Sequence, residues 1–164
     1  MSLSEQVERE DSATALRRFD PALFQGQHSS ASQHGAKPID VLLVDDHAMV
    51  RQGLRSVLDG YADIEVVGEA ANGEEAVAMS ERLRPSLVLM DINMPKMSGV
   101  DATAHIKARH PEIVVIGLSV QAGHEPHLAM LKAGATRLLT KEAAVDQLHH
   151  AILQALNRVP ETRR

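Results

Sequence analysis

Cysteine is absent from this chain of 164 residues, and long apolar runs are absent as well. A chain without cysteine has no disulfide framework, no cysteine-based metal site and no thiol catalysis, and its composition fits a reducing compartment. No run approaches the length that spans a membrane. Residues 4–10 are rich in charge, and no apolar stretch of a signal peptide follows them. We therefore expect a soluble cytoplasmic protein with no membrane partner.

An excess of positive charge is also missing. The chain has 17 Lys and Arg against 22 Asp and Glu, a net charge of -5, and shows no basic stripe of the kind that binds a phosphate backbone. We therefore expect no direct contact with nucleic acid. The length and a hydrophobic content of 44% are sufficient for one domain with a substantial core.

The first 38 residues differ from the rest of the chain. Residues 25–35 contain almost no apolar side chains, which is typical of a flexible linker, and residues 4–19 are compatible with a short helix. We expect a flexible tail or linker at 1–38, one folded domain at 39–157 and a short tail at 158–164.

From residue 40 onward, short apolar runs alternate with amphipathic stretches. The apolar runs predict five strands, at 41–44, 64–67, 87–90, 113–118 and 137–139. The amphipathic stretches predict five helices, at about 48–59, 73–83, 99–109, 124–133 and 142–156. Runs that are apolar throughout indicate strands buried on both faces. The predicted fold is therefore α/β, a doubly wound five-stranded parallel sheet in the order 2-1-3-4-5 flanked by five helices.

Acidic residues follow two of the predicted strands. Asp45 and Asp46 come directly after the first strand, and Asp91 comes directly after the third. The carboxyl ends of these neighbouring strands meet in the ligand crevice of such a sheet, so the carboxylates repel one another unless a cation is present. Oxygen ligands without Cys or suitably spaced His favour Mg2+. Taken alone, Asp45 or Asp46 could instead be only the N-cap of the next helix.

The other strand ends add a hydroxyl and an ammonium group. Ser119 ends the predicted fourth strand and Lys141 follows the fifth, so the full set is suited to handling phosphate. Asp91 is the best candidate nucleophile because it begins a loop open to an incoming donor, and the carbonyl of Asn93 could face the metal. Alternatively, Ser119 only caps a helix and Lys141 is solvated. We interpret His47 and the pair His149-His150 as ordinary surface residues.

Four motifs occur in a fixed order within residues 40–157 and together resemble one known family. They are Asp45-Asp46-His47, Asp91-x-x-Met94-Pro95-x-x-x-Gly99, Leu118-Ser119, and Gly134-Ala135 followed by Lys141. They resemble the receiver domain of two-component response regulators and hybrid sensor kinases. The resemblance implies a signalling phosphoacceptor rather than an enzyme, with possible self-catalysed phosphorylation and dephosphorylation. Its donor would be a histidine kinase or a histidine phosphotransfer protein.

The same resemblance implies a role for each residue of the site and a signalling surface. The expected output partner is unspecified, and a phosphorylation-dependent dimer could form through the fourth helix, fifth strand and fifth helix. The implied roles are Asp91 as phosphoacceptor and metal ligand, Asp46 as direct Mg2+ ligand, Asp45 as water-mediated or hydrogen-bonding partner, Asn93 as carbonyl ligand, and Ser119 and Lys141 as the groups that hold the phosphoryl group.

Among the departures from the family pattern, two bear on signalling and on access to the site. Receivers often carry Tyr or Phe three residues before the lysine, where this chain has Leu138, and Ala or Gly where it has Val120. Leucine cannot make the aromatic rotamer switch, and the bulk of Val120 hinders access of donors or hydrolytic water.

Two other functions compete with this interpretation. An aspartate-nucleophile phosphohydrolase would use similar groups, but such enzymes place an Asp-x-Asp pattern after the first strand, whereas Asp45 and Asp46 are adjacent here. The chain could also be the receiver half of a transcription regulator whose DNA-binding domain is absent. The eight residues from Asn157 to Arg164 are too few for such a domain.

Overall fold

The computed structural model describes residues 36–121 and 123–158, and the structural statements below concern these residues. The chain divides into two units, residues 1–37 and 38–164, and the fold is that of the second unit. The expectations for the helix at 4–19, for the linker up to residue 35 and for most of the C-terminal tail lie outside the described residues. Within them, no helix has the length and apolar content needed to cross a membrane.

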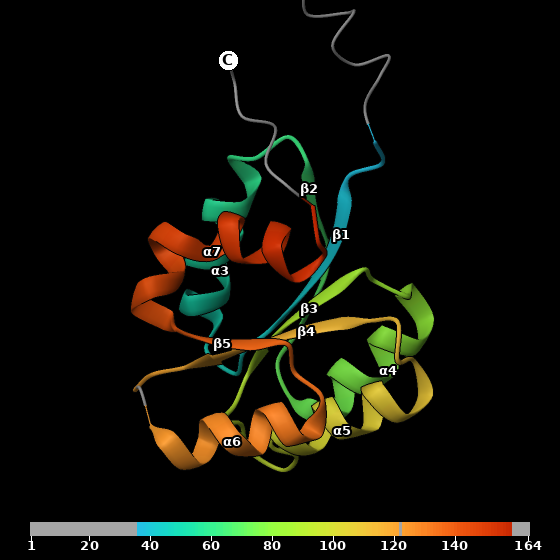
Figure 1. Cartoon of the computed structure of the whole chain (residues 1–164), viewed down its shortest axis with the longest axis vertical. Helices are drawn as coiled ribbons and strands as arrows, with labels where there is room; N and C mark the ends of the chain where they lie inside the picture. Colours follow the sequence, from blue (N-terminus) through green and yellow to red (C-terminus); the bar gives the residue numbers. More distant parts are fainter. Residues whose placement is uncertain (1–35, 122, 159–164) are drawn as a thin grey trace, which may run out of the picture. The chain divides into compact units, whose positions relative to one another are not determined.

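Five parallel strands alternate with five helices, which confirms the predicted fold class (Figure 1). The order in the sheet is β2-β1-β3-β4-β5, as the sequence predicts. The strands are β1 (Ile39–Val44), β2 (Ile64–Ala70), β3 (Leu87–Asp91), β4 (Val114–Ser119) and β5 (Arg137–Thr140). The helices are α3 (Ala48–Asp59), α4 (Gly73–Leu83), α5 (Gly99–Arg109), α6 (His124–Ala133) and α7 (Lys141–Ala155).

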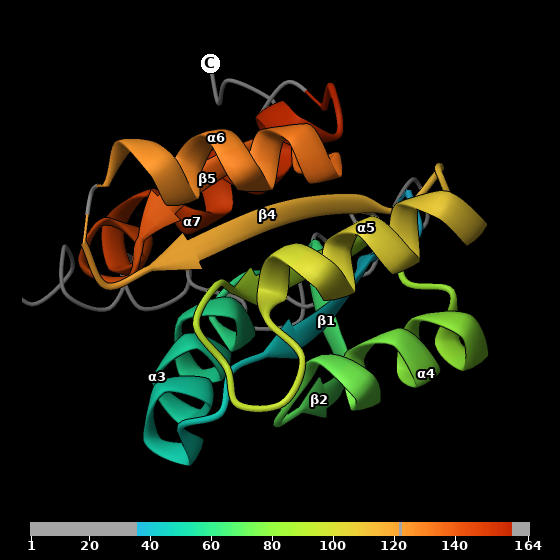
Figure 2. The same cartoon turned by 90° about the horizontal axis from the view of Figure 1, so that it is seen from below.

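Helices cover both faces of the sheet. Figures 1 and 2 show α3 and α7 on one face and α4, α5 and α6 on the other. Neighbouring strand residues point to opposite faces, so Leu43 and Leu89 belong to the core under α3 and α7, whereas Leu42 and Val88 belong to the core under the other helices. This double burial explains why the strands read as continuous apolar runs.

The largest difference from the predicted bounds is at β2. This strand continues to Ala70, three residues beyond the predicted end, and its pairing register with β1 shifts between Val41 and Leu42. Its residues after Ile64 are exposed or half-buried until Ala70 is reached, because β2 is one of the two edge strands of the sheet. An edge strand with a shifted register lacks the unbroken apolar run that marks the central strands.

Side-chain caps fix the starts of α4, α5 and α7 next to the carboxyl edge of the sheet, and the caps of α4 and α7 show the pattern. The Asn72 side chain accepts the N–H of Glu75, and the Glu75 carboxylate accepts the N–H of Ala71, each at 2.9 Å. At α7, the Thr140 hydroxyl accepts the N–H of Ala143 at 3.1 Å. The cap at Thr140 makes Lys141 the first helical residue, one position earlier than predicted, and thereby fixes where its side chain departs.

Candidate functional site: an acidic crevice at the carboxyl edge of the sheet

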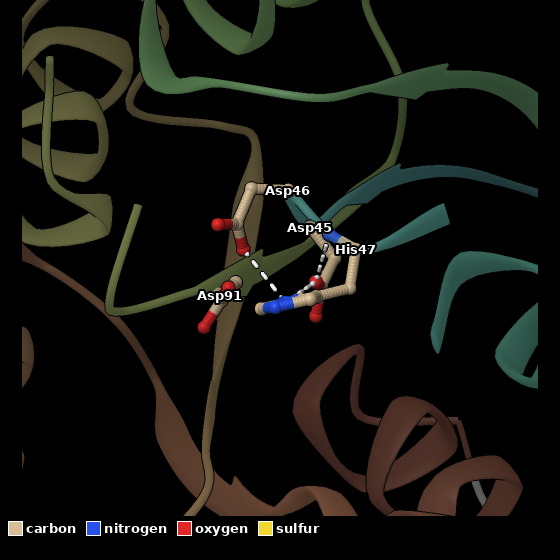
Figure 3. Close-up of side chains that lie close together, drawn as sticks. All are labelled: Asp45, Asp46, His47 and Asp91. Carbon is tan, nitrogen blue, oxygen red and sulfur yellow. Dashed lines mark hydrogen bonds and ion pairs between the residues drawn. The ribbon is translucent and has the colours of Figure 1, made fainter. Parts of the chain in front are cut away.

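Two buried carboxylates lie at the carboxyl edge of the sheet, at the ends of neighbouring strands. Asp45 follows β1, Asp91 ends β3, and each residue is only 1% exposed. Asp46 lies beside them with a quarter of its side chain exposed. Figure 3 shows the three carboxylates and the His47 ring gathered together, and one donor atom from each lies within 4.8 Å of the others. The parallel pairing of β1 with β3 produces this cluster.

Lys141 reaches the same crevice from the start of α7. Its Nζ lies 2.6 Å from Asp45 Oδ2 and 3.4 Å from Asp91 Oδ2, and its side chain is 16% exposed. The alternative that Lys141 is merely solvated is therefore wrong. Its one ammonium group is shared by two buried carboxylates, and it is held more closely by Asp45 than by Asp91.

The excess of carboxylates over ammonium groups changes the acidity of the site. Burial, and then the negative charge of Asp45, raise the pKa of Asp91 from 3.8 to about 6, although the charge of Lys141 opposes the shift. Burial disfavours the charged form of Lys141, yet the hydrogen bond to Asp45 and the charge of Asp91 raise its pKa above 10.5. Lys141 is therefore charged at neutral pH, and the crevice keeps a net negative charge.

The loop after Asp91 has a tightly constrained backbone. The N–H of Asn93 donates to Asp91 Oδ1 at 3.3 Å, and the N–H of Gly99 donates to the Ile92 carbonyl at 2.8 Å. A Cβ at Gly99 would lie 1.9 Å from the carbonyl oxygen of Asp91, so only glycine fits at this start of α5. Asn93 is exposed beside the crevice, and the role of its carbonyl as a metal ligand stays a prediction.

The turn after β1 is held from two sides. Asp45 Oδ1 accepts the N–H of His47 at 2.8 Å, and Arg51 donates from its guanidinium to the Asp45 carbonyl at 2.6 Å. The N-cap residue of α3 is His47, without a side-chain cap. The alternative that Asp45 or Asp46 is this N-cap is therefore wrong. His47 is 69% exposed, but its Nδ1 lies 3.1 Å from Asp46 Oδ1, a contact that the interpretation as an ordinary surface residue missed.

Ser119 ends β4 and is 5% exposed. It comes directly after Leu118, the residue that pairs with Asp91 across the sheet. Its hydroxyl donates to the carbonyl of Gln121 at 2.9 Å, and the N-cap of α6 is Gly123, so Ser119 does not cap that helix. Ser119 also lines a groove of about 430 Å3. The other residues of this groove are Gly123, His124, His127, Leu138, Leu139 and Thr140.

His149 is a structural residue that the sequence did not reveal. Its ring stacks on Tyr61 with the centroids 3.8 Å apart, and its Nε2 lies 3.0 Å from both carboxylate oxygens of Asp63. The interpretation of His149 as an ordinary surface residue is therefore wrong, whereas His150 is exposed. These contacts join α7 to the segment before β2, and a separation of 86 positions between His149 and Asp63 leaves no local signal.

The acidic crevice suits a hard divalent cation. The buried atoms Asp46 Oδ1 and Asp91 Oδ2 accept no hydrogen bond from the described part of the chain. His47 Nδ1 lies 3.1 Å from Asp46 Oδ1, and Lys141 Nζ lies 3.4 Å from Asp91 Oδ2. Clustered carboxylate oxygens that lack donors match the ligands that hard cations prefer. The residues present therefore fit a bound cation.

The fold and the site together define a class of protein. A doubly wound sheet whose switch point between β1 and β3 holds buried carboxylates and a lysine is an α/β domain suited to phosphoryl chemistry. Residues 41–153 match the family model of the response regulator receiver domain, and the chain belongs to this family. The resemblance seen in the sequence is thereby confirmed. Receiver domains are signalling modules in phosphorelays and not an enzyme family, so the phosphohydrolase alternative gains no support.

Known relatives cover this domain. The chain is 38% identical over 114 residues to the transcriptional regulatory protein DegU of Brevibacillus brevis. The aligned residues make up 70% of this chain and 48% of DegU. It is 42% identical over 114 residues to the response regulator VraR of Staphylococcus aureus, and these residues make up 70% of this chain and 54% of VraR. The chain thus spans about half the length of these relatives. The response regulator domain of Thermotoga maritima CheB matches with a TM-score of 0.70 and 32% identity, covering 76% of this chain and 100% of that chain.

The name of one relative bears on the expected absence of nucleic acid as a partner. DegU is a transcriptional regulatory protein. The expectation that this chain works without direct contact with nucleic acid is therefore not supported.

Proposed function

We propose that Asp91 accepts a phosphoryl group from a histidine kinase or a histidine phosphotransfer protein, and that the domain passes this signal to a partner. The observation that carries the proposal is the sharing of the Lys141 ammonium between Asp45 and Asp91, with the shorter distance to Asp45. This asymmetry leaves Asp91 as the less engaged carboxylate. Asp91 also begins the loop by which a donor approaches, which suits a nucleophile.

In the proposed step, an oxygen of Asp91 forms a bond to phosphorus while the phosphorus–nitrogen bond to the donor imidazole breaks. The electron pair of the broken bond stays on the imidazole nitrogen. Lys141 faces the phosphoryl oxygens because it already lies 3.4 Å from Asp91. Ser119 donates to a phosphoryl oxygen only after its hydroxyl leaves the Gln121 carbonyl, so the proposed step breaks this hydrogen bond.

We assign the cation as Mg2+. Its ligands would be the carboxylates of Asp45, Asp46 and Asp91 and the backbone carbonyl of Asn93, an all-oxygen set. When bound, the ion supplies positive charge that offsets the carboxylates and the oxygens of the incoming phosphoryl group. A pKa of about 6 keeps most of Asp91 ionised at neutral pH, as a nucleophile requires.

The test is incubation of the whole chain with Mg2+ and the small donor acetyl phosphate, followed by intact mass spectrometry. We expect one labile phosphoryl adduct on the wild type and none on Asp91→Asn. Asp59→Asn is the matched control, since this exposed residue ends α3, and it should be modified like the wild type. An adduct that persists on Asp91→Asn would contradict the assignment. Release of phosphate from an unrelated phosphate ester would instead favour the phosphohydrolase.

Asp46→Ala tests the cation separately from the acceptor. We expect this variant to lose Mg2+-dependent phosphorylation while it remains folded, because Asp46 is less buried than Asp45 or Asp91. Full phosphorylation of Asp46→Ala would show that Asp46 is not a ligand.

The proposed output surface is the face of α6, β5 and α7. This face carries the groove at Ser119 and exposed apolar side chains, namely Leu128 at 43%, Leu131 at 39% and Val145 at 58%. We expect phosphorylation to shift a two-state equilibrium there and to promote a dimer. Light scattering with and without acetyl phosphate tests this. A dimer that forms equally in Asp91→Asn would contradict the coupling.

A further inference from the structure

We propose that His47 supplies an imidazole nitrogen to the cation held by Asp45, Asp46 and Asp91. The site would then bind a first-row transition ion such as Co2+ more tightly, relative to Mg2+, than its carboxylates alone would allow. This inference rests on the proposed cation site and adds a ligand to it.

The position of the His47 ring carries the proposal. Nδ1 lies 3.1 Å from Asp46 Oδ1 and 3.5 Å from Asp45 Oδ1, and Figure 3 shows the ring directed toward the carboxylates. One donor atom from each of Asp45, Asp46, His47 and Asp91 lies within 4.8 Å of the other three. Ligands of an octahedral ion at about 2.1 Å are roughly 3 Å apart when adjacent and roughly 4.2 Å apart when opposite. The four donors therefore need only a small contraction to share one ion.

The local backbone leaves the ring of His47 available for this role. His47 is the N-cap residue of α3, but its side chain makes no capping hydrogen bond. Its main chain is anchored, because its N–H donates to Asp45 Oδ1 at 2.8 Å. The ring itself is 69% exposed, so a small rotation toward an ion displaces little packed structure. An anchored residue whose exposed ring can rotate is suited to act as a ligand.

The ligand type decides which ions benefit. Carboxylates and carbonyls suit Mg2+, whereas an imidazole nitrogen suits first-row transition ions, whose affinity for nitrogen-containing sites exceeds that of Mg2+. Adding one imidazole to an all-oxygen set therefore raises the affinity for Co2+ and changes that for Mg2+ little. A hydrogen bond or ion pair from His47 to Asp46 alone would produce no such difference between the two ions.

The experiment compares the affinities of Co2+ and Mg2+ by calorimetry on the whole chain. We expect His47→Ala to weaken Co2+ about tenfold, the scale on which single groups around a metal act, while Mg2+ affinity stays within about twofold. In the proton NMR spectrum of the Co2+ complex, strongly shifted imidazole signals should be present in the wild type and absent in His47→Ala. The matched control is His105→Ala, an exposed histidine on α5, which should behave as the wild type.

Shifted imidazole signals that persist in His47→Ala would overturn the proposal. So would an unchanged ratio of the two affinities. Failure here is distinct from failure of the proposed function, which is measured separately by the phosphoryl adduct that the wild type forms on Asp91 in Mg2+. A wild type that binds neither ion would overturn both.

Discussion

The two halves of the carboxyl edge of the sheet are built by different forces. At the ends of β1 and β3, the buried carboxylates of Asp45 and Asp91 lie 2.6 and 3.4 Å, respectively, from the Nζ of Lys141, which reaches them from the start of α7. At the ends of β4 and β5, the groove beside Ser119 is backed by Leu138 and Leu139. The first half therefore responds to charge, to pH and to cations, whereas the second responds to side-chain volume. This division separates Asp91, the proposed phosphoacceptor, from the surface that is proposed to pass the signal to a partner.

Removal of the Lys141 ammonium group should have the largest effect on the free energy of unfolding. Lys141→Ala leaves Asp45 and Asp91 buried without their counter-charge, which costs about 3 to 5 kcal/mol in buried ion pairs. We expect urea unfolding at pH 8 in EDTA to show this loss and added Mg2+ to recover part of it. Lys132→Ala, at an exposed position on α6, should leave the free energy of unfolding unchanged. Equal losses in the two variants would mean that the crevice does not depend on its lysine.

Substitution of Asp91 should raise the free energy of unfolding, whereas substitution of Lys141 lowers it. Burial and the charge of Asp45 raise the pKa of Asp91 to about 6, so ionisation of Asp91 disfavours the folded state. The contribution of protonated Asp91 to the free energy of unfolding is therefore full below about pH 4 and is lost as the pH rises through 6. Asn cannot ionise. We therefore compare the free energies of unfolding of Asp91→Asn and the wild type in EDTA. The difference between them should change by about 2 kcal/mol in favour of the variant between pH 4 and pH 8. Urea titrations at several pH values measure this, with Asp59→Asn as a control that shows no such trend.

The same division explains how much the sequence could predict. The central strands and most helix bounds were predictable because apolar runs on both faces and turn residues between them give unambiguous local signals. Asp45, Asp91 and Lys141 were predictable as a cluster because the carboxyl ends of all the parallel strands lie along one edge of the sheet, whatever the side-chain rotamers are.

Other features depend on rotamers or on distant residues. The His47 ring contacts Asp46 only through its rotamer. The Ser119 hydroxyl donates to the carbonyl of Gln121 in the following loop, and His149 contacts residues that are distant in the sequence. None of these contacts leaves a periodic pattern. The last residues of β2 were missed because an edge strand is less apolar.

Beside the groove at the ends of β4 and β5, the free energy of unfolding should depend on side-chain volume and not on charge. A Cβ at Gly117 would lie 2.4 Å from Leu138 Cδ1 and 2.9 Å from Met130 Cε, so Gly117→Ala should cost about 1 to 2 kcal/mol by overpacking. The cost should be equal at pH 6 and pH 8, with or without Mg2+. In a Leu138→Ala background it should shrink by about 1 kcal/mol, as expected for residues in contact.

Gly53→Ala is the matched control for this substitution. Gly53 lies in α3 with nothing within 4 Å of an added Cβ, so the change should raise stability by up to about 1 kcal/mol through helix propensity. A cost of Gly117→Ala that varies with Mg2+ would show that the two halves are coupled without phosphorylation.

The smallest expected effect lies at the border between the two halves, at Val120. This residue directly follows Ser119 and is 68% exposed, so Val120→Ala should change the free energy of unfolding by less than about 0.5 kcal/mol. The family resemblance implies that the bulk of Val120 hinders donors and hydrolytic water, so we expect the smaller residue to speed both phosphorylation by acetyl phosphate and loss of the phosphoryl group about twofold. Time courses by intact mass measure both rates. Faster phosphorylation with unchanged hydrolysis would show that donor and water reach Asp91 by different routes, and unchanged rates for both would show that Val120 lies outside the path.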